Sequence, residues 1–203
     1  MAQSERLLLD QHLPEFDVTR VHHRVIDASV ERTWETVKSV DLMRVGEVWP
    51  ITRALMWVRR LPDAVTRSSG QDGEPLSFDD VAATEGWVKL DEVPGRELVL
   101  GAVGKVWRPR IEWRSVSRSE FSEFAVPGYA KIAVGLSVRP YGRRRTLLSY
   151  EARTATTDEV ARRRFQRYWR LIGWGAGAVM RGALELIGRE AEGRLDGVEH
   201  EHA

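Results

Sequence analysis

The fold is decided by residues 156–187, which read TTDEVARRRFQRYWRLIGWGAGAVMRGALELI. Apolar side chains recur in this stretch at steps of three and four residues, the period of one face of an α-helix. Thr156 and Glu159 have the spacing of a capping box at the start of a helix. The stretch therefore predicts one long amphipathic helix that closes the domain. Its apolar stripe comprises Ala161, Phe165, Trp169, Ile172, Ala176, Met180, Ala183 and Ile187.

Glycines interrupt this predicted helix at positions 173, 175, 177 and 182. A glycine inside a helix costs about 0.5–1 kcal/mol relative to alanine, so the pattern needs a structural reason. We expect that the helix bends or breaks near Trp174, that it approaches a sheet closely, or that it leaves room for a ligand.

Upstream of the helix, the apolar period changes to two, which is typical of β-strands. Val93-Pro94-Gly95 and Tyr141-Gly142 stand where two hairpins must turn. Between these hairpins the strand signal is weaker. The expected strands cover residues 18–26, 83–92, 96–107, 111–117, 121–126, 129–139 and 145–154.

The first predicted strand leads into short helices. Ser29 offers an N-cap oxygen to a helix that begins at Val30, and Pro50 can start a second helix that ends before Pro62. Residues 66–77 are rich in turn-forming residues and predict a loop. We expect an N-terminal arm (1–17), a single α+β domain (18–192) and a disordered tail (193–203).

Composition excludes several classes of protein. The chain has 203 residues, with 31 basic and 30 acidic side chains and a net charge of +1, so no global field favours a nucleic acid. No apolar run approaches the roughly 20 residues of a membrane span, so we expect no integral membrane segment. The absence of cysteine excludes disulfides, thiolate metal sites and cysteine nucleophiles, and fits a cytoplasmic location.

The histidines do not form an obvious metal site. His22 and His23 are adjacent on a strand and so face opposite ways, and only His12 remains outside the tail. The tail pair His200 and His202 lacks a third ligand. The glycines between residues 173 and 177 lack the strand that precedes a phosphate-binding loop. We expect neither a metal nor a cofactor.

The order of elements resembles the helix-grip fold of the START-like superfamily, also called SRPBCC. The resemblance rests on Val25-Ile26-Asp27-Ala28, on Val30-Glu31-Arg32-Thr33-Trp34, and on the closing-helix segment Arg164-Phe165-Gln166-Arg167-Tyr168-Trp169. It implies a curved antiparallel sheet wrapped around the last helix, with a cavity for an apolar ligand between them. Members of the superfamily include lipid carriers, polyketide cyclases and aromatases, hormone receptors and a chaperone activator, so the resemblance leaves the activity open.

Following this resemblance, we expect the protein to bind a small apolar molecule of lipid, polyketide or isoprenoid type, as a carrier or sensor. The residues expected to line the cavity are Trp49, Trp57, Val134, Leu136, Phe165, Trp169, Ile172 and Met180. Ligand identity and oligomeric state stay open.

Two other function classes also stay open. A cyclase-like enzyme needs a positioned acid or base, for which Glu151 is the candidate base and Arg153 or Lys131 the candidate anion holder. The alternative interpretation of Glu151 and Arg153 is a surface ion pair. A protein-interaction module would instead expose a large apolar patch.

Overall fold

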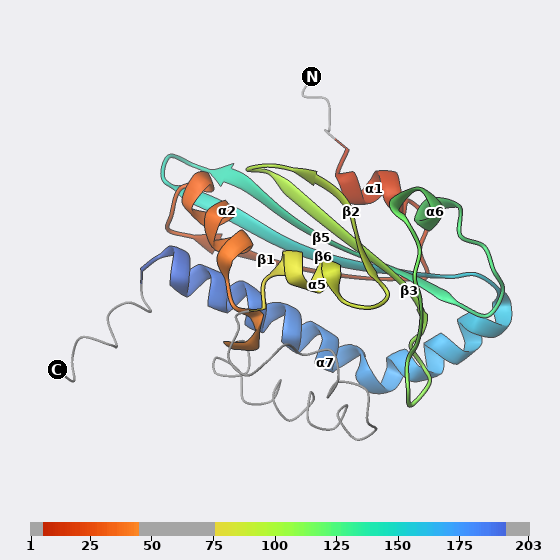
Figure 1. Cartoon of the computed structure of the whole chain (residues 1–203). Coiled ribbons are helices and arrows are strands. Elements are labelled where there is room, and N and C mark those ends of the chain that lie inside the picture. Colours follow the sequence, from red (N-terminus) through yellow and green to blue (C-terminus); the bar gives the residue numbers. More distant parts are fainter. Residues whose placement is uncertain (1–5, 45–75, 194–203) are drawn as a thin grey trace.

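The computed structural model describes residues 6–44 and 76–193. An antiparallel sheet carries the long helix α7 on one face and the short helix α1 on the other (Figure 1). This arrangement confirms the predicted α+β fold of helix-grip type. The strands are β1 (Val18–Ile26), β2 (Trp87–Val93), β3 (Glu97–Lys105), β4 (Glu112–Arg114), β5 (Ala130–Tyr141) and β6 (Arg145–Thr156). The helices are α1 (Leu8–His12), α2 (Val30–Ser39), a 3-10 turn (Leu42–Arg44), α5 (Phe78–Ala83), α6 (Arg118–Glu123) and α7 (Glu159–Ala191).

The strands are ordered β1-β6-β5-β3-β2, with the short β4 paired to β3. We call the sheet face that α7 covers the inner face and the opposite one the outer face. Beneath the C-terminal half of α7, the inner face is a close-packed core in which Leu186 and Ile187 meet side chains such as Leu98 and Leu148. Helix α2, capped by Ser29 as predicted, adds Trp34 and other apolar side chains to the same core.

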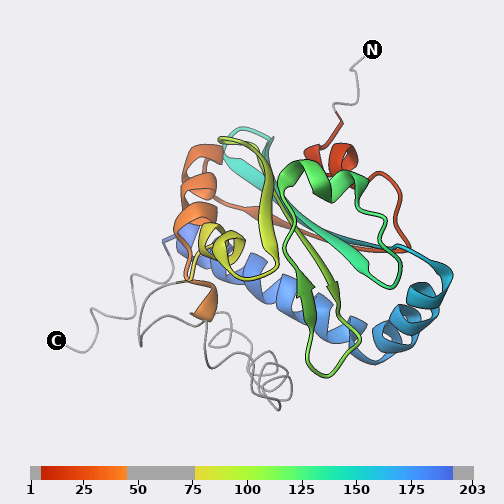
Figure 2. The same ribbon diagram turned by 45° about the vertical axis from the view of Figure 1, so that its right-hand side comes forward.

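The outer face has a smaller core of its own. Leu8, Leu9 and Leu13, from α1 and the residue after it, pack with Val99 and Phe121. Figure 2 shows α1 and α6 side by side on this face. Residues 6–13 of the expected N-terminal arm therefore lie against the sheet.

Helix α7 is continuous over 33 residues, and it changes direction within its first half (Figures 1 and 2). Its N-cap is Asp158, which accepts hydrogen bonds from the amides of Val160 and Ala161. The predicted capping box is wrong because Thr156 is the last residue of β6.

The glycines of α7 permit close approach to the edge strand β1. A Cβ atom at Gly177 would stand 3.3 Å from His22 Nε2, and one at Gly188 would stand 2.9 Å from Arg24 Cδ. A side chain at Gly188 would require the Arg24 side chain to shift. Of the three explanations for the glycine-rich stretch, the structure shows the bend and the close approach.

Local capping chemistry explains where the expected strands are wrong. Residues 118–123 form α6 and not a strand, because Ser117 and Glu120 make a reciprocal capping box. Ser77 and Asp80 do the same at α5, which takes residue 83 out of the predicted strand. The expected strand 111–117 is reduced to β4.

Some expectations lie outside the described residues. These are Trp49, Trp57, the helix expected between residues 50 and 61, most of the loop 66–77, and the tail after residue 193.

Candidate functional site

The candidate site lies on the inner face, beneath the first half of α7. Helix α7 packs mainly on β1 and β6 at one side of the sheet. Inward-facing side chains of the other strands are therefore only half-buried there, as at Ile132 and Trp87. Ile172 and Ala176 belong to the inward stripe of α7 and are half-buried as well. These inward-facing apolar side chains keep accessible surface and are available for contact with an apolar ligand.

Tyr150 is a neutral polar side chain on the same inner face, where it packs against the core beneath the C-terminal half of α7. It lies on the inner face of β6, packs edge-on against Phe78 with ring centroids 6.3 Å apart, and is half-buried. Burial raises the pKa of Tyr150 to about 12. Within the described part of the chain, its hydroxyl has no hydrogen-bond partner. The half-buried side chain can therefore offer its hydroxyl to the polar group of a ligand.

The β1 side of the region is basic. Arg20 lies over the ring of Trp169, with its guanidinium carbon 5.7 Å from the ring centroid, and Trp169 stacks on Phe165. His22 Nε2 is buried without a hydrogen-bond partner. Desolvation, with the charges of Arg181 and Arg20, lowers the pKa of His22, so the neutral imidazole is favoured.

The residues expected to line a cavity divide into two groups. Trp169 and Ile172 are half-buried and border the candidate site, with the largely buried Val134 on the same inner face. Leu136, Phe165 and Met180 are at most 4% exposed and serve as core.

The candidate catalytic groups lie on the other side of the sheet. In β6 the inward residues are Leu148 and Tyr150, so the odd-numbered Glu151 and Arg153 face outward. Lys131 also faces outward, where its ammonium donates to the carbonyl of Ser122. The expectation that these charges border the space under α7 is corrected by this placement.

Arg153 anchors the N-terminal segment to the outer face. Its guanidinium pairs with Glu151 and Asp10, at 2.7 Å each, and donates to the carbonyl of Leu13 at 3.1 Å. Burial opposes the charge of Arg153, but the hydrogen bonds that its guanidinium donates to both carboxylates outweigh this effect and raise the guanidinium pKa. This is a structural ion-pair network.

Sequence reasoning missed Tyr150, Arg20 and His22 as site residues. The alternation of residues 145–154 already placed Tyr150 on the apolar face together with Leu148. This alternation identifies the inward face of β6, whereas the charged pair Glu151 and Arg153 lies on the outward face.

Described residues line two cavities to which α7 contributes no side chain. One, of about 470 Å³, lies between the N-terminus of α2 and the exposed Arg143, Arg144 and Arg145 of the β5–β6 hairpin. The other, of about 360 Å³, lies on the outer face beside α1.

The described residues offer neither a metal site nor a membrane span. Among residues 6–44 and 76–193, no group of His, Cys, Asp or Glu side chains is arranged to hold a metal ion. No described helix is both long and apolar enough to cross a bilayer.

Comparison with known proteins gives distant structural matches. No family model and no curated protein matches the chain. A hypothetical protein from Helicobacter pylori is 8% identical with a TM-score of 0.46, over 94% of this chain and 99% of that one. A protein from Arthrobacter aurescens is 15% identical with a TM-score of 0.39, over 91% and 92%.

The ZhuI aromatase/cyclase from a Streptomyces species is also among the matches. It is 12% identical with a TM-score of 0.32, over 85% of this chain and 94% of that one. At such identities and scores these matches assign neither a family nor an activity, so any functional argument must come from the site itself.

Proposed function

We propose that the protein binds a small apolar molecule with one polar group beneath the first half of α7, as a carrier or sensor. The observation that supports this proposal is the set of half-buried, inward-facing apolar side chains beneath the first half of α7, with the half-buried Tyr150 on the same inner face. Val134, Trp169 and Ile172 provide apolar contact, and Tyr150 supplies the hydrogen bond that orients the ligand.

Apolar burial supplies the affinity for such a ligand. Each Å² of apolar surface removed from water contributes about 25 cal/mol, which favours a lipid, polyketide or isoprenoid over a polar metabolite. The Tyr150 hydroxyl contributes orientation, because a partner that satisfies it restores a hydrogen bond inside the protein.

The placement of the three candidate charges favours a carrier or sensor over an enzyme that would use them as acid-base groups. Glu151, Arg153 and Lys131 face the outer side of the sheet, so a ligand under α7 does not meet them. The raised pKa of Tyr150 keeps its hydroxyl protonated, so at neutral pH it donates a hydrogen bond and does not act as a base.

The test is native mass spectrometry and tryptophan-fluorescence titration with oleic acid, farnesol and emodin, which represent the three ligand types. Ile172→Trp fills the space and should abolish binding, whereas Val25→Trp adds the same side chain on the exposed outer face and should not. Tyr150→Phe should weaken binding about tenfold. The proposal is wrong if all three probes fail to bind, or if Ile172→Trp binds as well as the unmodified chain.

A further inference from the structure

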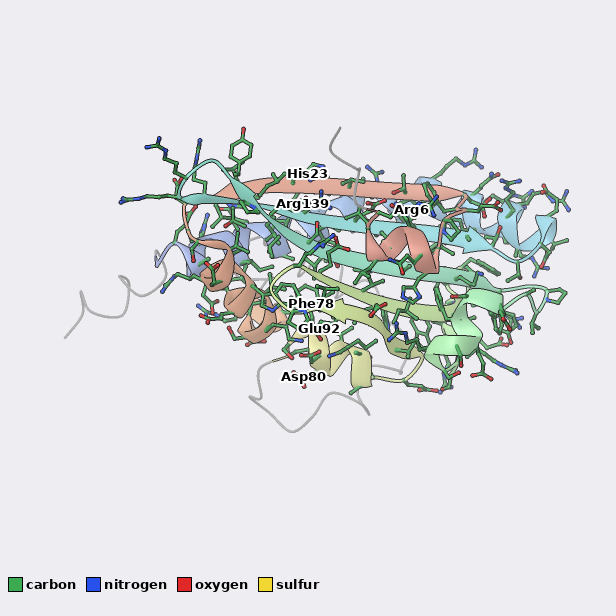
Figure 3. All side chains as sticks on the ribbon, turned by 90° about the horizontal axis from the view of Figure 1, so that it is seen from above. Arg6, His23, Phe78, Asp80, Glu92 and Arg139 are labelled. Carbon is green, nitrogen blue, oxygen red and sulfur yellow. The ribbon has the colours of Figure 1, made fainter. Side chains whose placement is uncertain are left out.

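The cavity on the outer face is lined by charged side chains, and the proposed function does not use it. Its volume of about 360 Å³ falls in the range of small-molecule sites, roughly 300–1,000 Å³. Figure 3 views this face from above, with Arg6, His23 and Arg139 labelled. The lining joins the segment around α1 to strands β1, β3, β5 and β6.

Glu97, at the start of β3, is the buried charge of this cavity. Its side chain is 3% exposed, and its Oε2 accepts a hydrogen bond of 2.7 Å from the amide of Leu8. Its Oε1 is buried and accepts no hydrogen bond. Arg96 Nε and Arg139 Nη2 stand 3.5 and 3.7 Å from Oε1, which gives attraction without a hydrogen bond. A buried carboxylate oxygen is normally satisfied, so Oε1 lacks a donor.

The other acidic groups of the cavity already have partners. Glu151 binds Arg153 and accepts a hydrogen bond from Thr19, and Asp10 binds Arg153. Glu97 Oε1 is therefore the acceptor that remains for a ligand.

Positive charge and apolar surface complete the lining. Arg6 is exposed and the side chain of Arg139 is 45% exposed, so both guanidinium groups can move without disturbing a core. His23 is held by a 2.8 Å contact between its Nδ1 and Ser149 Oγ. The apolar lining includes Leu7, Leu9, Val21, Val99 and Leu147.

We propose that this cavity binds a free α-amino acid with an apolar side chain. The ammonium group donates to Glu97 Oε1 and takes the place of the Arg139 guanidinium beside it. The displaced guanidinium and that of Arg6 pair with the ligand carboxylate, so the charges of Glu97, Arg139 and the ligand are all paired in the complex. The apolar side chain of the ligand packs between Leu9 and Val21.

The chemistry of the lining favours a zwitterion over a simple anion or cation. An anion would pair with Arg6 and Arg139 but would leave Glu97 Oε1 without a donor. A simple amine would satisfy Oε1 but would leave the displaced guanidinium without an anion. Only a ligand that carries both groups satisfies both sides of the cavity.

The experiment is isothermal titration calorimetry of the full chain with each of the twenty standard L-amino acids, beginning with L-leucine. Two analogues of leucine separate the contributions: 3-methylbutan-1-amine lacks the carboxylate and 4-methylpentanoate lacks the ammonium group. We expect saturable binding of leucine and about tenfold or greater loss with either analogue. Absence of saturable binding for all twenty amino acids up to about 10 mM overturns the proposal, as does equal affinity for an analogue.

Variants place the binding at this cavity. Arg139→Gln should weaken binding about tenfold or more, and Glu97→Gln should do so for leucine while changing the affinity for 4-methylpentanoate little. Arg143→Gln is the matched control, because it removes an exposed arginine of the same hairpin that lines the other cavity. Because nearly half of the Arg139 side chain is exposed, we expect Arg139→Gln to keep the fold. Unchanged affinity in Arg139→Gln contradicts the proposal even if Glu97→Gln fails to fold.

Discussion

The two faces of the sheet are covered by helices of very different length, and different interactions hold the helix on each face. On the inner face, α7 has 33 residues and is held by apolar packing of its C-terminal half. On the outer face, α1 has five residues and a small apolar contact, so Arg153 adds ion pairs and a backbone hydrogen bond. A short helix buries too little surface to hold itself, and polar anchors make up the difference.

The largest effect should come from the inner-face core. Ile187→Ala removes a fully buried side chain and should lower the free energy of unfolding by about 3 kcal/mol, measured by urea denaturation. Val25→Ala, on the exposed edge of the outer face, is the control and should change stability by less than about 0.5 kcal/mol. A loss below about 1 kcal/mol for Ile187→Ala would contradict the apolar attachment of α7.

The second effect should be local to the outer face. Arg153→Leu leaves Glu151 and Asp10 without their partner and should cost about 2 kcal/mol. Hydrogen exchange should rise at the amides of residues 7–13 but not in the C-terminal half of α7.

A matched substitution separates this anchor from general loss of charge. Arg163→Leu removes an exposed arginine from α7, where its contact with Glu159 is 4.0 Å long, and should leave both measurements nearly unchanged. Equal effects of the two substitutions would mean that Arg153 does not anchor α1.

The contrast between the two faces also explains what the sequence could predict. Residues 130–138 alternate strictly, and the structure confirms their strand and the long helix after it. However, Ala133 and Ser137, which face the outer side of β5, are also buried, because α1 and its neighbours cover the outer face. Alternation assigns residues to the two faces of a sheet, but it does not show which helix packs on which face.

For the same reason, the sequence predicts the candidate catalytic groups on the wrong face of the sheet. Glu151 and Arg153 were correctly paired on one face of β6, but the partner of that face is α1, whose Leu7-Leu8-Leu9 run is too short to show a helical period. The buried Glu97 was equally hidden, since its partner Leu8 is 89 residues away in sequence. By contrast, the alternation of β6 is enough to place Tyr150 on the inner face, because Tyr150 lies two residues after the apolar Leu148.

The smallest effect should be a pH dependence at the inner face. Desolvation and the charges of Arg181, Arg20 and His23 lower the pKa of His22 below the ordinary value of 6.5. Between these two values the unfolded chain binds the proton and the folded chain does not, so stability falls as the pH drops through about 6.5 toward the folded pKa. Below the folded pKa both states are protonated, and the loss of stability stays constant.

His22→Gln should therefore be more stable relative to the unmodified chain at about pH 5.5 than at about pH 7.5, as measured by urea denaturation at both pH values. His23→Gln removes only one of the charges that act on His22, so it should change the pH dependence less than His22→Gln does. A stability difference for His22→Gln that is the same at both pH values would contradict the prediction.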